Sequence, residues 1–150
     1  MNEEAEKPVI VRFMDWVRQR CEAVATAHGL KVYDERERSL AWLIESGLAE
    51  LEAPTVVVSL PATGPVKEGD CGAQDYTVEV LVAMRYKPTA KDGAGDAFAA
   101  VLALFGAFDA AVFEMPAGFP PNVQPTRLTH DLRRDESLHS FTVRTTISFN

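Results

Sequence analysis

The feature that most constrains this fold is a long alternation of apolar and polar residues from Asp75 to Lys87. Its large apolar members are Tyr76, Val78, Val80, Val82, Met84 and Tyr86. Because successive side chains of a strand point to opposite faces, the pattern predicts one long β-strand with a buried face. The opposite face is polar except at Leu81 and Ala83, so we expect its middle to be partly covered.

Two main helices are predicted from apolar residues at helical spacing. The first begins at Pro8 and ends at Gly29, which are typical start and stop residues. Its apolar side consists of Ile10, Phe13, Met14, Val17, Cys21, Val24 and His28. The second runs from about Asp96 to Val112, and Asp96 is expected to cap it. Its apolar residues are Phe98, Val101, Leu102, Phe105, Phe108 and Val112.

Shorter elements complete the expected order. Between the main helices we predict a short extended piece (Leu30–Tyr33) and a weak helix (Leu40–Leu51) interrupted by Gly47. A buried β-branched strand (Thr55–Leu60) and a loop (Ala62–Ala73) follow. After the second main helix we predict an irregular Pro-rich segment (Glu114–Pro125) and the start of a strand (Arg127–His130). A polar turn (Asp131–Ser137) and a closing strand (His139–Asn150) complete the chain.

This order predicts a single α+β domain spanning residues 1–150, since 150 residues with 47% hydrophobic content suit one core. Strands joined by short loops favour a mostly antiparallel sheet of about four to five strands, packed against the two main helices. Residues 1–7 are expected to be a flexible acidic tail without signal-peptide character. No apolar window approaches the roughly 20 residues of a membrane span, so no membrane partner is expected.

The charge balance limits the classes of partner. A formal net charge of −7 argues against a broad nucleic-acid surface, which needs clustered Lys and Arg. The two cysteines, Cys21 and Cys71, lack the paired spacing of a zinc site and are expected to be free thiols. No cofactor and no metal are predicted.

One segment resembles a phosphate-binding loop. Gly93–Phe98 reads Gly-Ala-Gly-Asp-Ala-Phe, which resembles the signature of ribokinase-type sugar kinases. That resemblance implies backbone N–H groups facing phosphate charge and Asp96 as general base. The family needs a much longer chain with nucleotide and sugar sites that are not found here. A glycine turn followed by a capped helix is therefore the favoured interpretation.

Other catalytic patterns are weaker. His130-Asp131 resembles the dipeptide of metal-dependent phosphohydrolases, but the other ligands of that family are not identifiable, so a strand-end pair is favoured. Cys21 and His28 share a helical side but are about 10 Å apart in rise, too far for a thiolate–imidazole pair. We therefore predict that the chain is not an enzyme.

A charged run follows the first helix. Asp34, Glu35 and Glu37 are a conceivable cation site, because carboxylates are hard-cation ligands. Arg36 and Arg38 interleave with them, so a solvated, self-compensating run of charges is the favoured interpretation.

The overall arrangement resembles the tail-terminator or tail-completion family of long-tailed bacteriophages, including related minor tail and neck proteins. The resemblance rests on a helix ending near Gly29-Leu30, a Pro-led strand Pro54–Val58, the long strand Asp75–Tyr86, an apolar helix Asp96–Val112 and a final strand Phe141–Phe149.

The resemblance implies a structural virion protein whose subunits form a homo-oligomeric ring, a hexamer in this family, located in the virion tail or neck and assembled in the host cytoplasm. The ring would cap the tail tube and join it to the head-side connector, while DNA passes through without specific binding. A small cytoplasmic α+β binding or adaptor module is the alternative. A phosphotransferase-like enzyme using the Gly93–Asp96 loop is a remote one.

Ring contacts between different patches of neighbouring subunits are formed by exposed loops and edge strands. The expected interface residues lie in the Pro-rich segment and in the Ala62–Ala73 loop; they are Phe113, Met115, Phe119, Val123, Val66 and Lys67. For Phe113 and Met115, completion of the hydrophobic core is the open alternative.

Overall fold

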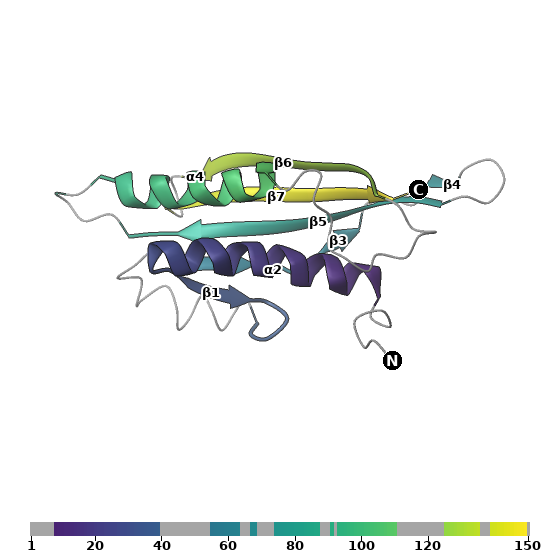
Figure 1. The fold of residues 1–150 in the computed structure, drawn as a ribbon, viewed down its shortest axis with the longest axis horizontal. Coiled ribbons are helices and arrows are strands. Elements are labelled where there is room, and N and C mark those ends of the chain that lie inside the picture. Colours follow the sequence, from purple (N-terminus) through teal and green to yellow (C-terminus); the bar gives the residue numbers. More distant parts are fainter. Residues whose placement is uncertain are drawn as a thin grey trace.

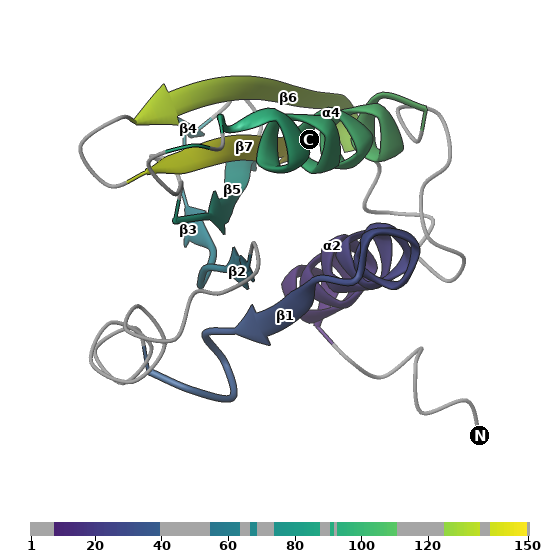
Figure 2. The same ribbon diagram turned by 90° about the vertical axis from the view of Figure 1, so that its left-hand side faces the viewer.

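Two helices pack side by side on one face of a mixed β-sheet in this computed structural model (Figure 1; Figure 2). The structure describes residues 8–39, 55–63, 67–68, 74–87, 91, 93–110, 125–135 and 139–149. The helices are α2 (Val9–His28) and α4 (Gly95–Ala110). The strands are β1 (Lys31–Asp34), β2 (Thr55–Val58), β3 (Ala62–Thr63), β4 (Lys67–Glu68), β5 (Gln74–Arg85), β6 (Pro125–Asp135) and β7 (Ser140–Phe149). The α+β prediction is confirmed.

The main sheet has the strand order β1-β2-β5-β7-β6. All its neighbours are antiparallel except β1 and β2, which are parallel with Lys31 beside Thr55. The expectation of mostly antiparallel pairing is therefore confirmed, with one parallel pair added. Parallel pairing requires a long connection, and residues 35–54 separate these two strands in the sequence.

Strand β5 forms the centre of the sheet, as its alternation predicts. Val78, Val80, Val82 and Met84 are fully buried on the side of the helices. On the opposite side, Leu81 and Ala83 are half-buried, as expected.

The predicted Ala62–Ala73 loop is partly wrong, because it contains β3 and β4, which both pair antiparallel with β5. Strand β2 covers only the Val82–Arg85 end of its neighbour β5. The two short strands supply hydrogen-bonding partners farther along the same edge, where backbone groups would otherwise lack them.

The predicted polar turn Asp131–Ser137 is also wrong over its first part. Strand β6 continues to Asp135, which pairs with Ser140 of β7. The alternation of Leu128, His130 and Leu132 continues through this region on the helix side, with Leu128 and Leu132 packed against the core. The two-residue alternation of buried side chains therefore determines the secondary structure of this segment, even though its composition is polar.

Helix α2 has the predicted bounds. Its residues Phe13, Val17 and Cys21 are fully buried against the sheet, whereas His28, expected on the apolar side, is exposed in the last turn. Gly29 ends the helix in the left-handed conformation, with φ of 67°. The Leu30 N–H donates to the Ala25 carbonyl at 3.0 Å, which satisfies one of the last helical carbonyls.

Replacing Gly29 by Ala is expected to lower the free energy of unfolding by about 1 kcal/mol, because a Cβ disfavours the left-handed region. Urea denaturation would measure the loss, and Gly29→Asn should lose less. Gly93→Ala is the matched control, since a Cβ at Gly93 meets no atom within 4 Å and its φ is not left-handed. Equal stability of the Gly29→Ala and Gly93→Ala variants would contradict the assignment.

Helix α4 begins differently from the prediction. The Phe98 N–H donates to the Ala94 carbonyl at 2.8 Å, so Ala94 is the capping residue and Asp96 lies in the first turn. An acidic side chain in that turn still complements the helix dipole.

The buried side of α4 differs in part from the prediction, since Val101 and Phe108 are buried as predicted but Phe98 and Leu102 are not. The buried side consists of Ala97, Ala100, Val101, Leu104 and Phe108. Phe98 and Leu102 were expected among the core residues but are 48% and 46% exposed. Small alanines on the inner side allow α4 to lie close to its neighbours, and this orientation turns Phe98 and Leu102 outward. The predicted helix Leu40–Leu51 and most of the Pro-rich segment lie outside the described residues.

Candidate interaction surface

The residues expected to form an interface are mostly not placed by the structure. Phe113, Met115, Phe119, Val123 and Val66 lie outside the described residues. Lys67 belongs to β4, where its backbone pairs with Asp75 of β5. The interface assignment of all six residues stays a prediction.

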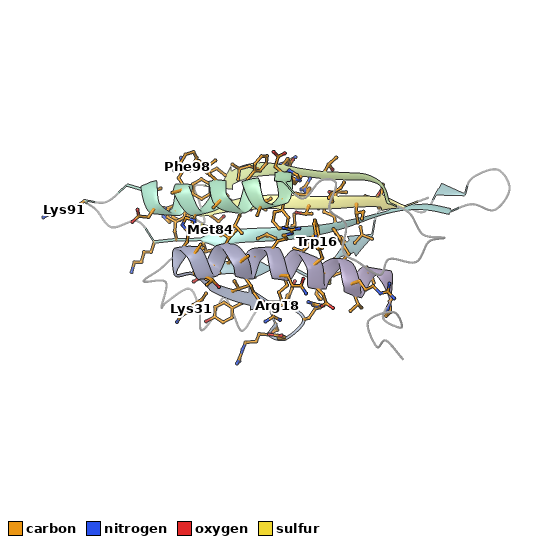
Figure 3. All side chains as sticks on the ribbon, in the orientation of Figure 1. Trp16, Arg18, Lys31, Met84, Lys91 and Phe98 are labelled. Carbon is orange, nitrogen blue, oxygen red and sulfur yellow. The ribbon has the colours of Figure 1, made fainter. Side chains whose placement is uncertain are left out.

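The described surface instead contains an exposed apolar helix side. We define the α4 outer face by the exposed residues Gly95, Phe98, Ala99, Leu102, Gly106 and Asp109. Figure 3 shows Phe98 on the side of α4 that faces away from α2. Phe98, Leu102 and Leu60 are the large hydrophobic side chains most exposed among the described residues. Two of the three therefore lie one helical turn apart on this face.

The composition of α4 is unusual for a helix with a solvent-facing side. Its only charged residues are Asp96 in the first turn and Asp109 in the last. Helices that are apolar all round are normally buried all round, because their surface favours removal from water. The outer face thus has the character of a contact surface rather than of a solvated one.

The two ends of the sheet offer backbone hydrogen-bonding groups. Among the described strands, β1 and β6 lie at the two edges of the main sheet. β6 carries exposed Asp131 and Arg133, whose Oδ2 and Nε atoms lie 3.4 Å apart. Charged side chains on an edge strand hinder indiscriminate strand pairing, so any partner at β6 must match its charges.

The sheet face opposite the helices is polar. Thr77 of β5 and Ser148 of β7 share a hydrogen bond of 3.3 Å between their hydroxyl oxygens. Glu79 and Arg144 form an ion pair of 3.2 Å on the same two strands. These cross-strand pairs stabilise the sheet from its solvent side.

The charged run after α2 is not simply solvated, which corrects the prediction. Asp34 is buried beneath α2, and its carboxylate accepts hydrogen bonds from the Arg36 side chain at 2.7–3.2 Å. Arg18 of α2 lies 3.5 Å from the same carboxylate, and Arg36 also pairs with Asp15 of α2 at 2.8 Å. The cluster joins α2 to β1.

The pKa values in this cluster reflect its pairing. Burial acts to raise the pKa of Asp34, but hydrogen bonds from Arg36 and the nearby charges of Arg36 and Arg18 hold that pKa below its ordinary 3.8. Hydrogen bonds to Glu37 and Glu22 raise the pKa of Arg18. Because arginines occupy the Asp34 oxygens, a cation site there is disfavoured. Among the described residues, no group of His, Cys, Asp and Glu side chains is arranged to hold a metal ion.

The possible thiol nucleophile is inaccessible. Cys21 is fully buried, and burial, together with the nearby Glu22 and Asp34, raises the pKa of its thiol to about 12. A thiolate is therefore scarce at neutral pH. His28 is exposed, so the two side chains do not form a nucleophile–base pair.

His130 and Asp131 do not converge on one site, because neighbouring strand residues point to opposite faces. The His130 side chain is 5% exposed, and its ring meets the Phe105 ring edge-to-face at 5.1 Å. Its Nε2 lies 3.3 Å from the Asp109 carboxylate of α4. Asp131 is exposed on the other face, which contradicts the phosphohydrolase-like reading.

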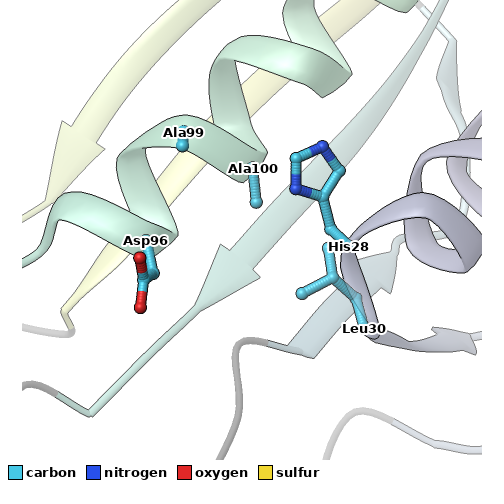
Figure 4. A pocket seen from close by; sticks show the side chains of 5 residues that line it. All are labelled: His28, Leu30, Asp96, Ala99 and Ala100. Atoms are coloured by element: carbon cyan, nitrogen blue, oxygen red, sulfur yellow. The ribbon is translucent and has the colours of Figure 1, made fainter.

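A pocket lies where the end of α2 meets the start of α4. It has a volume of about 290 Å³ and is lined by His28, Leu30, Asp96, Ala99 and Ala100 (Figure 4). Its two polar residues, His28 and Asp96, are both exposed. Asp96, the base required by the kinase-like hypothesis, thus lines a small opening that it shares with His28 and three aliphatic side chains.

No protein-family model matches the chain, and no curated protein matches it. In the part of the chain described, neither helix is both long and apolar enough to cross a membrane.

Proposed function

We propose that this chain is a structural subunit of a phage tail or neck, where a homo-oligomeric ring caps the tail tube and joins it to the head-side connector. The supporting observation is the apolar α4 outer face on a small α+β domain, because such a surface favours protein contact. Function then lies in interface geometry, and the subunit itself needs no reacting group.

The sheet edges are compatible with a head-to-tail ring. Such a ring requires two different surfaces that bind each other, and β1 and β6 lie at opposite edges of one sheet. The net charge of −7 suits a channel through which DNA passes without being gripped.

Negative-stain imaging and native mass measurement of the purified chain test the proposal. The expected result is a ring of six subunits with a central hole, which binds tail-tube or connector protein. A chain that stays monomeric at high concentration and binds neither partner would overturn it. A dimer that never forms rings would support the binding or adaptor module instead.

A further inference from the structure

Gly106 occupies an exposed position inside α4, where none of the other described residues accounts for a glycine. Glycine in a helix interior costs about 1 kcal/mol relative to alanine. A Cβ at Gly106 would meet no atom within 4 Å, so no neighbour among the described residues requires the bare position. Close approach of another molecule is a physical reason for keeping this position bare.

Gly106 lies in line with the two exposed large residues. Phe98, Leu102 and Gly106 follow one another at intervals of four, which places them along one ridge of the helix. Gly95 and Ala99 lie beside this ridge on the same outer face. The face therefore has a large side chain toward one end and a bare position toward the other, with Leu102 between them.

We infer that the α4 outer face packs antiparallel against the same face of a second copy of this chain, about a two-fold axis beside Leu102. Because the two helices run antiparallel and cross at Leu102, Phe98 of one copy lies beside Gly106 of the other. Leu102 then meets its own counterpart. Each large side chain finds either space or an apolar partner, which is the size complementarity that close helix packing requires.

The charges on the helix fit the same arrangement. Reversal about Leu102 places Asp109 level with Gly95, the first residue of α4 in the second copy. The N–H groups and the positive end of the helix dipole attract a carboxylate there, although Asp96 in the same first turn already supplies one negative charge. The Asp109 side chain is 71% exposed and can reach outward while remaining beside His130. Exposed Lys91 precedes this helix end and adds positive charge.

This two-fold contact goes beyond the proposed ring and occupies the α4 outer face, so a ring would close through other surfaces such as the β1 and β6 edges. A two-fold axis joins two subunits and cannot by itself close a six-membered ring. In a ring assembly it joins subunits of two rings, whereas without rings it produces a free dimer. In both cases the occupant of the α4 outer face is a second copy of this chain.

Disulfide trapping tests the geometry directly. In a Cys71→Ser background, Leu102→Cys places one accessible thiol at the two-fold axis, because Cys21 is buried. Mild oxidation is expected to give mostly covalent dimer on a non-reducing gel. The matched control is Ala23→Cys on the exposed side of α2, which should stay monomeric. Equal crosslinking of the two variants would overturn the inference.

A second measurement uses Gly106. Gly106→Gln should retain or raise the thermal stability of the subunit, while weakening self-association at least tenfold in sedimentation experiments. Ala23→Gln is the control and should leave self-association unchanged. Unchanged association of Gly106→Gln, or capture of a tail or connector protein by Leu102→Cys in place of a second copy, would also overturn it. If Gly106→Gln still forms rings, the proposed ring function stands independently of the two-fold contact. If Leu102→Cys gives dimers but no rings are found, the proposed ring function is overturned and the two-fold contact stands.

Discussion

Asp34→Asn is expected to lower the free energy of unfolding by about 3 kcal/mol at neutral pH, because it removes the charge from a buried, hydrogen-bonded carboxylate. The substitution keeps the size of the side chain but leaves Arg36 and Arg18 without their shared anion. Both arginines are only about a quarter exposed, at 25% and 26% of their side-chain surfaces, so water replaces the lost partner incompletely. Urea denaturation of the variant and the wild type measures the difference.

The same carboxylate predicts a pH dependence. Its pKa is lower in the folded state than the ordinary 3.8, so its charge stabilises the fold fully above pH 3.8. That contribution is lost as pH falls through the lower folded pKa. The stability difference between wild type and Asp34→Asn should therefore be largest at neutral pH and shrink as the pH falls below 3.8.

Glu37→Gln is the matched control for this cluster. Glu37 also pairs with Arg18, but its side chain is 59% exposed, and exposed pairs contribute about 0–1 kcal/mol. A loss in Asp34→Asn no larger than that in Glu37→Gln would contradict the buried bridge. A difference independent of pH would contradict the role of the carboxylate charge.

Elements defined by local patterns could be predicted from the sequence. The two-residue alternation of β5 and the helical stripe of α2 each identify a buried face without knowledge of the neighbours. The end of α2 at Gly29 follows from the conformational freedom of glycine. The parallel β1–β2 pair could not be predicted in this way, because pairing direction depends on where a distant connection leads the chain.

The orientation of α4 shows where periodicity fails. In a helix with only two charged residues, several sides are equally apolar, so spacing alone does not identify the buried one. The sequence favoured the large Phe98 and Leu102, whereas the fold buries Ala97 and Ala100. The sequence did contain one indication of the exposed side of α4. This is Gly106, which lies in the middle of a helix with no charged residue between Asp96 and Asp109.

Burial of Asp34 was missed for a related reason. A run of alternating charges normally indicates solvent, since isolated charges are costly to bury. Only the tertiary structure brings Asp15 and Arg18 of α2 onto the run, and these residues complete the pairing that makes burial of Asp34 possible.

Phe108→Ala is expected to lower the free energy of unfolding by about 3–5 kcal/mol, the usual range for removing a large aromatic ring from a core. Phe108 is fully buried and joins three elements. Its ring meets Trp16 of α2 edge-on at 6.2 Å and lies 6.4 Å from the His130 ring of β6. Its loss should therefore loosen α4 from both neighbours, with the transition midpoint in urea reporting the change.

Phe98→Ala should instead have little effect on stability but weaken self-association. Phe98 is 48% exposed and approaches only one aromatic neighbour among the described residues, Phe141 at 6.1 Å. Phe98→Ala should thus cost no more than about 1 kcal/mol, because much of its surface is already in water. Self-association should nevertheless weaken, since the ring is lost from the α4 outer face. Equal losses of stability at the two positions would mean that α4 is turned differently on the sheet, and both the buried side and the outer face would then have to be reassigned.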